Sequence, residues 1–153
     1  MVSIKNMVDP SKMFNERYAH RASQSLTMRE HFSELSYRIN FNKKVLEIGS
    51  NDGIFIKNFD PKNTIAVEPC SNFAKETQDM GYVTYPEFWT TKLANKIKSK
   101  HGKQEIIYAA NCICHIPDLD DTFKGVESIL EKGGQFIFED PSLLNIIKNT
   151  SYD

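Results

Sequence analysis

Cysteine is scarce in this 153-residue chain, which contains only Cys70, Cys112 and Cys114. An odd number of cysteines without a framework spacing excludes a small fold stapled by disulfides. A single residue separates Cys112 from Cys114 and no second pair accompanies them. We therefore predict no metal site, because a structural zinc site needs four ligands. We expect reduced thiols packed near strand ends.

An excess of charge of one sign is also lacking. The chain has 19 Lys and Arg against 20 Asp and Glu, a formal net charge of −1. This balance argues against a general nucleic-acid binder and provides no polybasic anchor for a membrane. No apolar run approaches the roughly 20 residues of a membrane helix, and residues 1–10 lack the apolar core of a signal peptide. We expect a cytoplasmic protein with neither a nucleic-acid nor a membrane partner.

Internal repeats and low-complexity tracts are absent as well, and the length favours one compact domain. We expect an N-terminal lead-in and helix over residues 1–40, with the first dozen residues extended. A Rossmann-like core follows over residues 41–153.

Short apolar runs alternate with segments of helical periodicity over most of the chain. Strands are predicted at residues 44–48, 64–67, 82–85, 105–110 and 135–138. Helices are predicted at residues 27–39, 71–80, 90–100, 119–131 and from 143 onward, with a helix opening at 54–59. This alternation predicts an α/β fold with an open, doubly wound, mostly parallel sheet of about five strands.

Local signals place the ends of several of these elements. Thr27 and Glu30 fit a capping box at the start of the first long helix. Ser71 is a candidate cap for the next long helix, and Gly81 and Gly133 are candidate helix stops. The strand at 135–138 would form a sheet edge, and bare edges invite pairing. We expect the C-terminal helix or another subunit to cover it.

Ligands of such sheets bind at the carboxyl ends of the strands. The first strand is followed there by Gly49-Ser50-Asn51-Asp52-Gly53. Glycine in such a bend permits positive φ and a close approach of a ligand to the backbone. The spacing is not the G-x-G-x-x-G of a dinucleotide site. Acidic Asp52 weakens attraction to a pyrophosphate, so the bend suits a positively charged ligand such as a sulfonium or an amine.

Polar and aromatic residues follow the other strands. Glu68-Pro69 ends the second strand, and a carboxylate at this place can accept both hydroxyls of a ribose, as it does in NAD sites. Phe88 follows the third strand and is a candidate cover for an adenine ring. Asn111 follows the fourth strand, and His115 lies four residues further on as a candidate acid or base.

Together these motifs resemble those of the class I S-adenosylmethionine-dependent methyltransferases. The Gly-Ser-Asn-Asp-Gly form of the bend, with Glu-Pro after the second strand, is more narrowly similar to the nucleotide-sugar C-methyltransferases of deoxysugar biosynthesis. The segment from Tyr18 to Ser25 also resembles the Tyr-x-Tyr-x-Ser-Ser-x-Ser segment of that family. His20 replaces its second tyrosine and Ala22 replaces the first serine of its serine pair.

The resemblance implies S-adenosylmethionine as the cofactor. It places the bend, from Gly49 to Gly53, against the amino-acid part of the cofactor, Glu68 and Pro69 at the ribose, and Phe88 near the adenine. Asn111 and His115 would line the methionine side. The implied cofactor contacts are therefore Gly49, Ser50, Asn51, Asp52, Gly53, Glu68, Pro69, Phe88 and Asn111.

The family reaction methylates a sugar carbon beside a keto group. A base removes the proton α to the carbonyl, and the resulting enolate attacks the sulfonium methyl group. The nearby candidates for catalysis in this chain are Tyr18, His20 and His115. None matches the family base, which belongs to a Tyr-x-Glu-His motif in a later region, and the family's cysteine-rich zinc module comes earlier. We therefore expect a cofactor-binding core with little sugar methylation of its own.

Three other functions remain open at this stage. The chain could be a complete small methyltransferase for another acceptor, assembled as a homo-oligomer. It could be a non-catalytic S-adenosylmethionine-binding module, or one half of a split enzyme with a separate C-terminal half. It could also be a nicotinamide oxidoreductase, which Glu68 permits but the glycine spacing and Asp52 disfavour.

Overall fold

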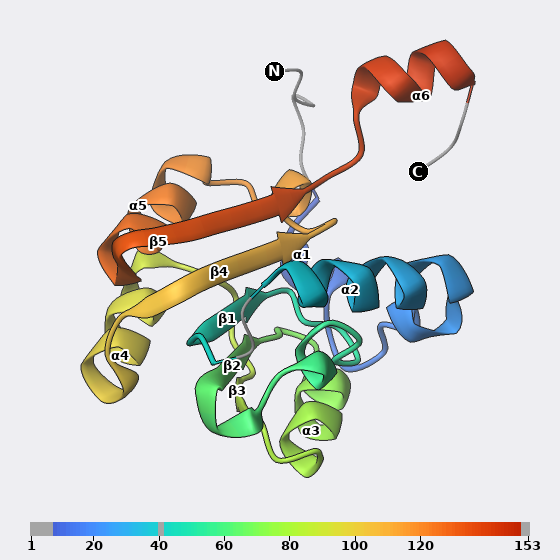
Figure 1. Cartoon of the computed structure of the whole chain (residues 1–153). Helices are drawn as coiled ribbons and strands as arrows, with labels where there is room; N and C mark the ends of the chain where they lie inside the picture. The colour runs from blue at the N-terminus through green and yellow to red at the C-terminus, as the bar shows by residue number, and fades with distance from the viewer. Residues whose placement is uncertain (1–7, 40–41, 151–153) are drawn as a thin grey trace.

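The computed structural model describes residues 8–39 and 42–150, and its centre is a parallel sheet (Figure 1). The strands are β1 (Val45–Ile48), β2 (Thr64–Val67), β3 (Val83–Tyr85), β4 (Gln104–Ala110) and β5 (Leu130–Glu139). All neighbouring strands pair in parallel, in the order β3-β2-β1-β4-β5. The order reverses between β1 and β4, and such a switch point opens a crevice at the carboxyl ends of the strands. The predicted α/β fold with a five-stranded sheet is confirmed.

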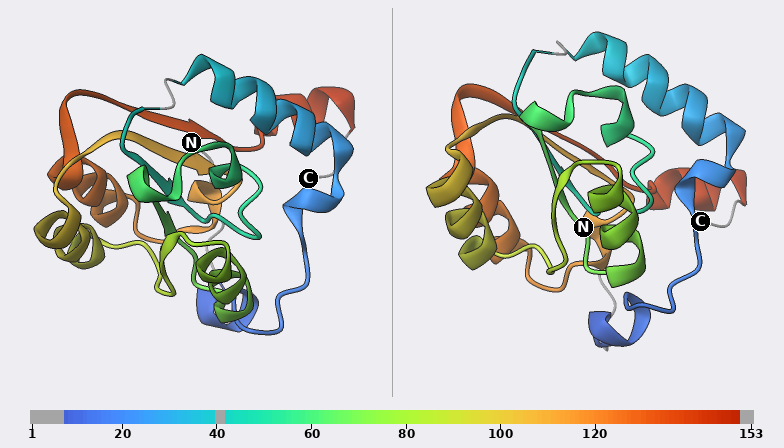
Figure 2. Two further views of the ribbon diagram at one scale, coloured as in Figure 1. Left: turned by 60° about the horizontal axis from the view of Figure 1, so that its bottom comes forward. Right: turned by 90° about the horizontal axis from the view of Figure 1, so that it is seen from below.

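Helices connect the strands and cover the sheet. The α-helices are α1 (Pro10–Met13), α2 (Leu26–Arg38), α3 (Ser71–Asp79), α4 (Thr91–His101), α5 (Leu119–Ile129) and α6 (Leu143–Asn149). Short 3₁₀ turns are η1 (Ala22–Gln24), η2 (Ile56–Asn58), η3 (Pro61–Asn63) and η4 (Ile113–His115). Figure 2 shows α4 and α5 on one side of the sheet and α2 on the other.

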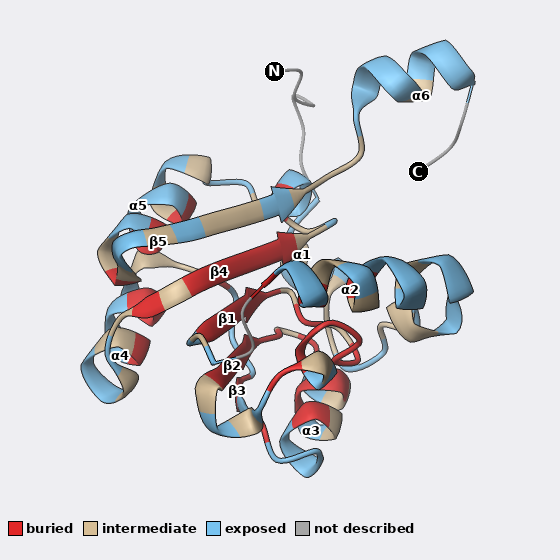
Figure 3. Ribbon diagram, in the orientation of Figure 1, coloured by how far each residue is buried: buried red, intermediate tan, exposed pale blue. Residues whose placement is uncertain are grey.

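Side chains that alternate along the strands build a core on each face of the sheet. Leu46 and Ile48 of β1 belong to the cluster that packs against α4 and α5. Val45 faces the other way, into the cluster with Phe32 of α2 and Phe55. All residues of β1 are buried, as the red strand in Figure 3 shows. A strand buried on both faces is typical of a parallel sheet that helices cover on both sides.

The N-terminal part differs from expectation in two places. The lead-in is not extended throughout, since Pro10–Met13 form α1, and the side chain of Asp9 caps this helix by accepting a bond from the Ser11 N–H at 2.9 Å. The long helix α2 begins at Leu26 rather than Thr27. Its cap is Ser25, whose Oγ accepts from the Met28 N–H at 3.2 Å. The predicted capping box at Thr27 and Glu30 was therefore wrong.

Three further predictions of element ends were also wrong. The segment 54–59 forms only the short turn η2, because Phe59 returns to an extended conformation. Gly133 does not end α5: the chain leaves the helix at Leu130, and β5 begins there. Gly134 lets β5 approach β4, since a Cβ at this position would lie 2.7 Å from the Glu105 carbonyl oxygen. A glycine pair within a strand is easily mistaken for a helix stop. The cap of α3 is Cys70, one residue before the predicted Ser71.

The outer edge of β5 is not covered by the C-terminal helix. In Figure 1, α6 continues beyond the carboxyl end of β5 and away from the strands. None of its residues is buried, and Leu144 and Ile147 are 73% and 69% exposed. The expectation that this helix covers the edge was wrong, whereas cover by another subunit remains a prediction. Among the residues that the structure describes, no helix is long and apolar enough to span a membrane.

Candidate functional site

A cavity of about 890 Å³ opens at the carboxyl ends of β1, β2 and β4. Its volume lies in the range of ligand sites in proteins. The predicted site residues that line it are Tyr18, His20, Gly49, Ser50, Asn51, Glu68, Pro69, Phe88, Asn111 and His115. Asp52 and Gly53 are the predicted residues that do not line it.

The bend after β1 is shaped by backbone contacts. The N–H groups of Gly49 and Ser50 donate to the Val67 carbonyl oxygen at 2.8 and 3.2 Å. Gly49 has a φ of +74°, and a Cβ there would lie 2.9 Å from the Cβ of Cys112. Only glycine satisfies both constraints, because a side chain is strained at this φ and has no room. The bend therefore presents bare backbone to the cavity.

Glu68 lies directly against this bend. Its Oε2 accepts from the Asn51 N–H at 2.7 Å, and its Oε1 accepts from the Cys70 N–H at 2.8 Å. The residue is 4% exposed. Burial raises the pKa of Glu68, although both N–H donors stabilise the carboxylate and oppose this shift. The two bonds hold the carboxyl group in one orientation at the wall of the cavity.

The end of β1 and the bend carry buried polar atoms that have no partner within the described residues. Glu47 of β1 is 2% exposed and Ser50 is 1% exposed, and both line the cavity. Glu47 Oε2 and Ser50 Oγ make no hydrogen bond. Buried polar atoms are seldom left unpaired, so these atoms fit a polar ligand in the cavity. Burial, reinforced by the charge of Glu68, raises the pKa of Glu47 well above its usual value.

Glu47 was assigned no role at the site from the sequence alone, although a signal was present. A carboxylate in the middle of the apolar run from Val45 to Ile48 is out of place in a buried strand. Trp89 follows Phe88, the aromatic residue predicted beyond the third strand; it is 5% exposed, lines the cavity and donates from Nε1 to the Thr122 carbonyl oxygen at 3.2 Å. Phe14, just after α1, lines the cavity as well, and no local sequence signal indicates this.

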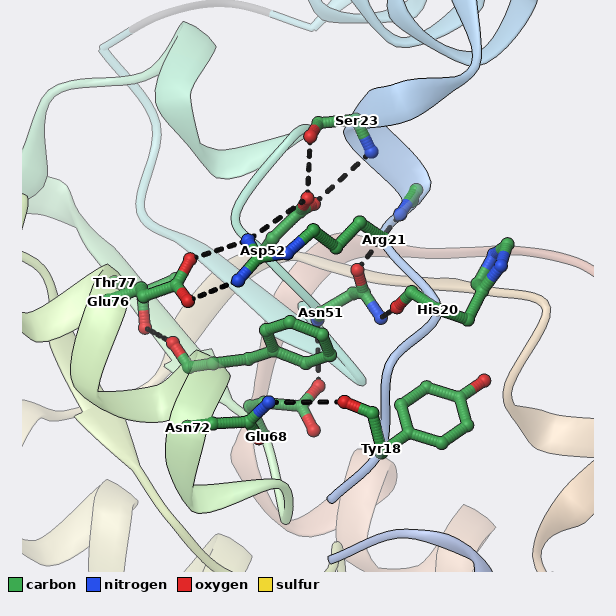
Figure 4. Close-up of polar contacts among 12 residues, drawn as sticks. Tyr18, His20, Arg21, Ser23, Asn51, Asp52, Glu68, Asn72, Glu76 and Thr77 are labelled. Carbon is green, nitrogen blue, oxygen red and sulfur yellow. Dashed lines mark hydrogen bonds and ion pairs between the residues drawn. The ribbon is translucent and has the colours of Figure 1, made fainter. Parts of the chain in front are cut away.

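Asn51 and Asp52 use their side chains within the chain, as Figure 4 shows. The Asn51 Oδ1 accepts from the Ala22 N–H at 3.0 Å, and its Nδ2 donates to the His20 carbonyl oxygen at 3.0 Å. The Asp52 carboxylate accepts from Ser23 Oγ at 2.6 Å. Its charge therefore serves the N-terminal segment, and the structure provides no support for its predicted contact with a cationic ligand.

Gly53 likewise has a packing role in the structure. Its φ is +78°, and a Cβ there would lie 3.0 Å from Cγ2 of Thr77 in α3. The residue allows the bend to turn tightly beside α3. Its predicted contact with the cofactor receives no support from the cavity lining.

Aromatic rings of the N-terminal segment and of His115 lie close together in the cavity lining. Tyr18 lies 5.2 Å from Phe14 and 6.4 Å from His20, and Phe14 lies 5.5 Å from His115, between ring centroids. All these rings line the cavity. The structure therefore brings the predicted catalytic candidates Tyr18, His20 and His115 to one cavity, while any role in catalysis stays a prediction.

Asn111 ends β4 in a conformation that few residues adopt. Its φ is +51°, and its N–H donates to the Glu139 carbonyl oxygen at 2.7 Å. Asparagine tolerates this left-handed region better than most residues. The turn brings Asn111 and Cys112 to the cavity wall, and Cys112 Sγ donates to the Ile48 carbonyl oxygen at 3.2 Å.

Comparisons with known proteins agree with this geometry. Residues 17–150 match the family described as methyltransferase domain. C-methyltransferase NovU of Streptomyces niveus is 27% identical over 161 residues, covering 100% of this chain and 38% of that protein. The chain thus spans well under half the length of this curated relative.

Solved structures share the fold. A S-adenosylmethionine-dependent methyltransferase from Clostridium acetobutylicum superposes with a TM-score of 0.59 at 22% identity, covering 79% of this chain and 54% of that chain. A possible histamine N-methyltransferase from Thermotoga maritima superposes with a TM-score of 0.55 at 21% identity, covering 72% and 50%. With the family match over most of its residues, the chain belongs to the class I S-adenosylmethionine-dependent methyltransferases, whose cofactor is S-adenosylmethionine.

Proposed function

We propose that this chain is the cofactor-binding core of a C-methyltransferase that acts on a keto-deoxysugar nucleotide in the cytoplasm. The observation that carries the proposal is the position of Glu68, whose carboxylate accepts from the Asn51 N–H at the glycine bend. A relative named as a C-methyltransferase aligns with the whole chain, which supports C-methylation. The sugar nucleotide rests on the resemblance of the segment from Tyr18 to Ser25.

The residues present fit S-adenosylmethionine. Glu68 would hold the ribose hydroxyls, and the bare backbone at Gly49 would lie along the amino-acid part. The unpaired Glu47 Oε2 and Ser50 Oγ offer buried polar partners at the base of the same cavity. When bound, the cofactor supplies a methyl group made electrophilic by a sulfonium. The chain's own contribution is to bind and orient it.

The acceptor side of the cavity suits an uncharged ring. Besides the aromatic residues, carboxylates line the cavity: Asp9, Glu47, Glu68, Asp118 and Asp121. No lysine or arginine lines it among residues 8–39 and 42–150. Acidic walls repel an anion, so we propose that the sugar ring enters the cavity. The diphosphate is held outside these walls.

A second candidate function is a binding module whose catalytic base comes from another polypeptide segment, as in a split enzyme. One observation favours it. Burial, with the nearby Cys70 and Glu68, raises the pKa of Tyr18. A phenol with a raised pKa stays protonated at neutral pH and does not act as a base. The partner would be a separate C-terminal half or a second copy of this chain.

Methyl transfer by the isolated chain separates these candidates. The chain is incubated with methyl-labelled S-adenosylmethionine and a keto-deoxysugar nucleotide, and labelled sugar is measured. We expect cofactor binding with little transfer, and transfer that appears when a C-terminal half carrying a base is added. Steady turnover by the chain alone would contradict the need for an external base, and transfer only to an unrelated acceptor would contradict the sugar.

A further inference from the structure

Residues 18–25, here called the strap, cross the glycine bend from outside (Figure 4). The strap runs into α2 and contributes Tyr18, His20, Ala22 and Ser25 to the cavity lining. We propose that Asn51 is a positioning residue. It holds the strap against the bend from Gly49 to Gly53. Tyr18 and His20 therefore line the acceptor side of the cavity only when the bend has its folded conformation. This inference rests on the proposed function for its catalytic meaning.

The side chain of Asn51 bonds the strap in both directions. Its Oδ1 accepts from the Ala22 N–H and its Nδ2 donates to the His20 carbonyl oxygen, each at 3.0 Å. A carboxamide carries an acceptor oxygen and a donor NH₂ on two separate atoms, so it can bond two backbone groups of the strap at once. The Asn51 side chain therefore satisfies one backbone N–H and one carbonyl group of the strap, as a neighbouring strand would. A carboxylate or a single hydroxyl in its place cannot reproduce both bonds.

The backbone of Asn51 contacts Glu68, the residue proposed to bind the cofactor ribose. The Asn51 N–H donates to Oε2 of Glu68 at 2.7 Å, and its φ of +49° turns the side chain toward the strap. Asparagine is several-fold enriched in this left-handed region. One residue thus joins the carboxylate proposed to hold the ribose to the segment that carries Tyr18 and His20.

Neighbouring side chains anchor the strap on either side of Asn51. Ser23 Oγ donates to Asp52 at 2.6 Å, and Asn72 Nδ2 donates to the Tyr18 carbonyl oxygen at 3.1 Å. Arg21 forms paired hydrogen bonds to Glu76 of α3 at 2.5 and 2.8 Å. These contacts account for the acidic, asparagine-containing form of the bend without a contact between Asp52 and the cofactor.

The test uses Asn51→Gly in the full chain. Glycine keeps the backbone N–H that meets Glu68 and accepts the positive φ, while both strap bonds are lost. Amide hydrogen exchange is read by mass spectrometry on peptides covering the strap and, separately, the sheet. We expect exchange in the strap to become about tenfold faster or more, because two side-chain bonds are lost, with sheet exchange unchanged. Unchanged exchange in the strap, or equally faster exchange throughout, would overturn the inference.

Two further variants identify which contact is responsible. Ser23→Ala removes the bond from the Ser23 Oγ to Asp52 without substituting a residue of the bend, and we expect a smaller acceleration in the same peptides. Asn51→Asp keeps an acceptor for the Ala22 N–H but places a carboxylate oxygen against the His20 carbonyl oxygen, so we expect no rescue relative to Asn51→Gly. As a control, Arg38→Gln breaks an exposed pair with Glu34 on α2, and strap exchange should not change. If Ser23→Ala does not accelerate exchange in the strap, the side-chain bonds between the strap and the bend do not hold the strap in place.

Addition of S-adenosylhomocysteine tests the link to the cofactor. We expect the ligand to slow strap exchange in the wild-type chain and to do so less in Asn51→Gly. Binding without any slowing of strap exchange would overturn the coupling. If the wild-type chain does not bind the ligand, the proposed function fails, whereas the ligand-free comparison still decides whether Asn51 holds the strap.

Discussion

The backbone N–H of Asn51 donates a 2.7 Å hydrogen bond to Oε2 of Glu68, and this bond joins the ends of the neighbouring strands β1 and β2. A second backbone donor, the Cys70 N–H, holds the other carboxylate oxygen at 2.8 Å. The acid is thus oriented before any ligand arrives. Preorganised groups bind better because their ordering cost is met during folding.

Replacement of this acid is the first test of the pocket. Glu68→Gln removes the charge and places an amide NH₂ against one of the two N–H donors, so one bond is lost. We expect S-adenosylhomocysteine to bind about 10- to 100-fold more weakly, since hydrogen bonds to charged groups contribute roughly 1.5–3 kcal/mol each. Isothermal titration measures the effect. Glu87→Gln, which removes an acid paired with Lys96 outside the cavity, is the matched control and should bind normally.

A methyl group at Gly49 tests the geometry of the bend. Gly49→Ala adds a Cβ 2.9 Å from the Cβ of Cys112 at a φ of +74°. Gly81→Ala meets nothing within 4 Å at a φ of +95°. Both variants carry the backbone cost, about 1–2 kcal/mol, and overpacking adds about 1–3 kcal/mol at Gly49 alone. Equal losses in the free energy of unfolding, measured in urea, would show that Cys112 moves aside freely.

The buried carboxyl group of Glu47 predicts a pH dependence of stability. Its pKa in the folded chain lies well above the usual 4.5, mainly because of burial. The folded state therefore holds this proton more tightly than the unfolded state does, and stability falls as the pH rises above about 4.5 toward the folded pKa. Glu47→Gln stays neutral at every pH, so this part of the decline should vanish. Parallel pH profiles of the free energy of unfolding for both proteins would contradict the assignment.

Trp89 provides an internal reporter of binding. It is the single tryptophan of the chain, and it is buried in the cavity lining. We expect its fluorescence to change saturably on addition of S-adenosylhomocysteine, and the signal to disappear in Trp89→Phe. Binding detected by titration calorimetry with no change in Trp89 emission would place the ligand away from this wall.

The strands were predictable because each apolar run is short and ends in glycine, proline or a polar residue. The meeting of Glu68 with the bend also followed from sequence, since neighbouring parallel strands end at the same edge of the sheet. The extension of β5 back to Leu130 could not be predicted from the sequence. The local sequence Gly133-Gly134 indicates a helix stop. In the structure, Gly134 is needed because a side chain there would collide with the carbonyl oxygen of Glu105 on the neighbouring strand.

The bonds from the strap to the bend and to α3 could not be predicted for a related reason. They join residues 29 or more positions apart, as between Ala22 and Asn51, and no local pattern records such a pairing. Asp52 was assigned to a cationic ligand from the sequence because an acid in the bend weakens attraction to a pyrophosphate. The structure shows a use that only the folded chain reveals, a bond to Ser23.

Titration of the wild-type chain with S-adenosylhomocysteine measures whether this cavity binds the cofactor. We expect saturable one-to-one heat at ligand concentrations below about 1 mM, a Kd range that corresponds to more than roughly 4 kcal/mol of binding free energy. We also expect Glu68→Gln to weaken this binding and Glu87→Gln to leave it unchanged. Absence of heat up to millimolar ligand, or equal binding by Glu68→Gln, would contradict the assignment of this cavity to the cofactor.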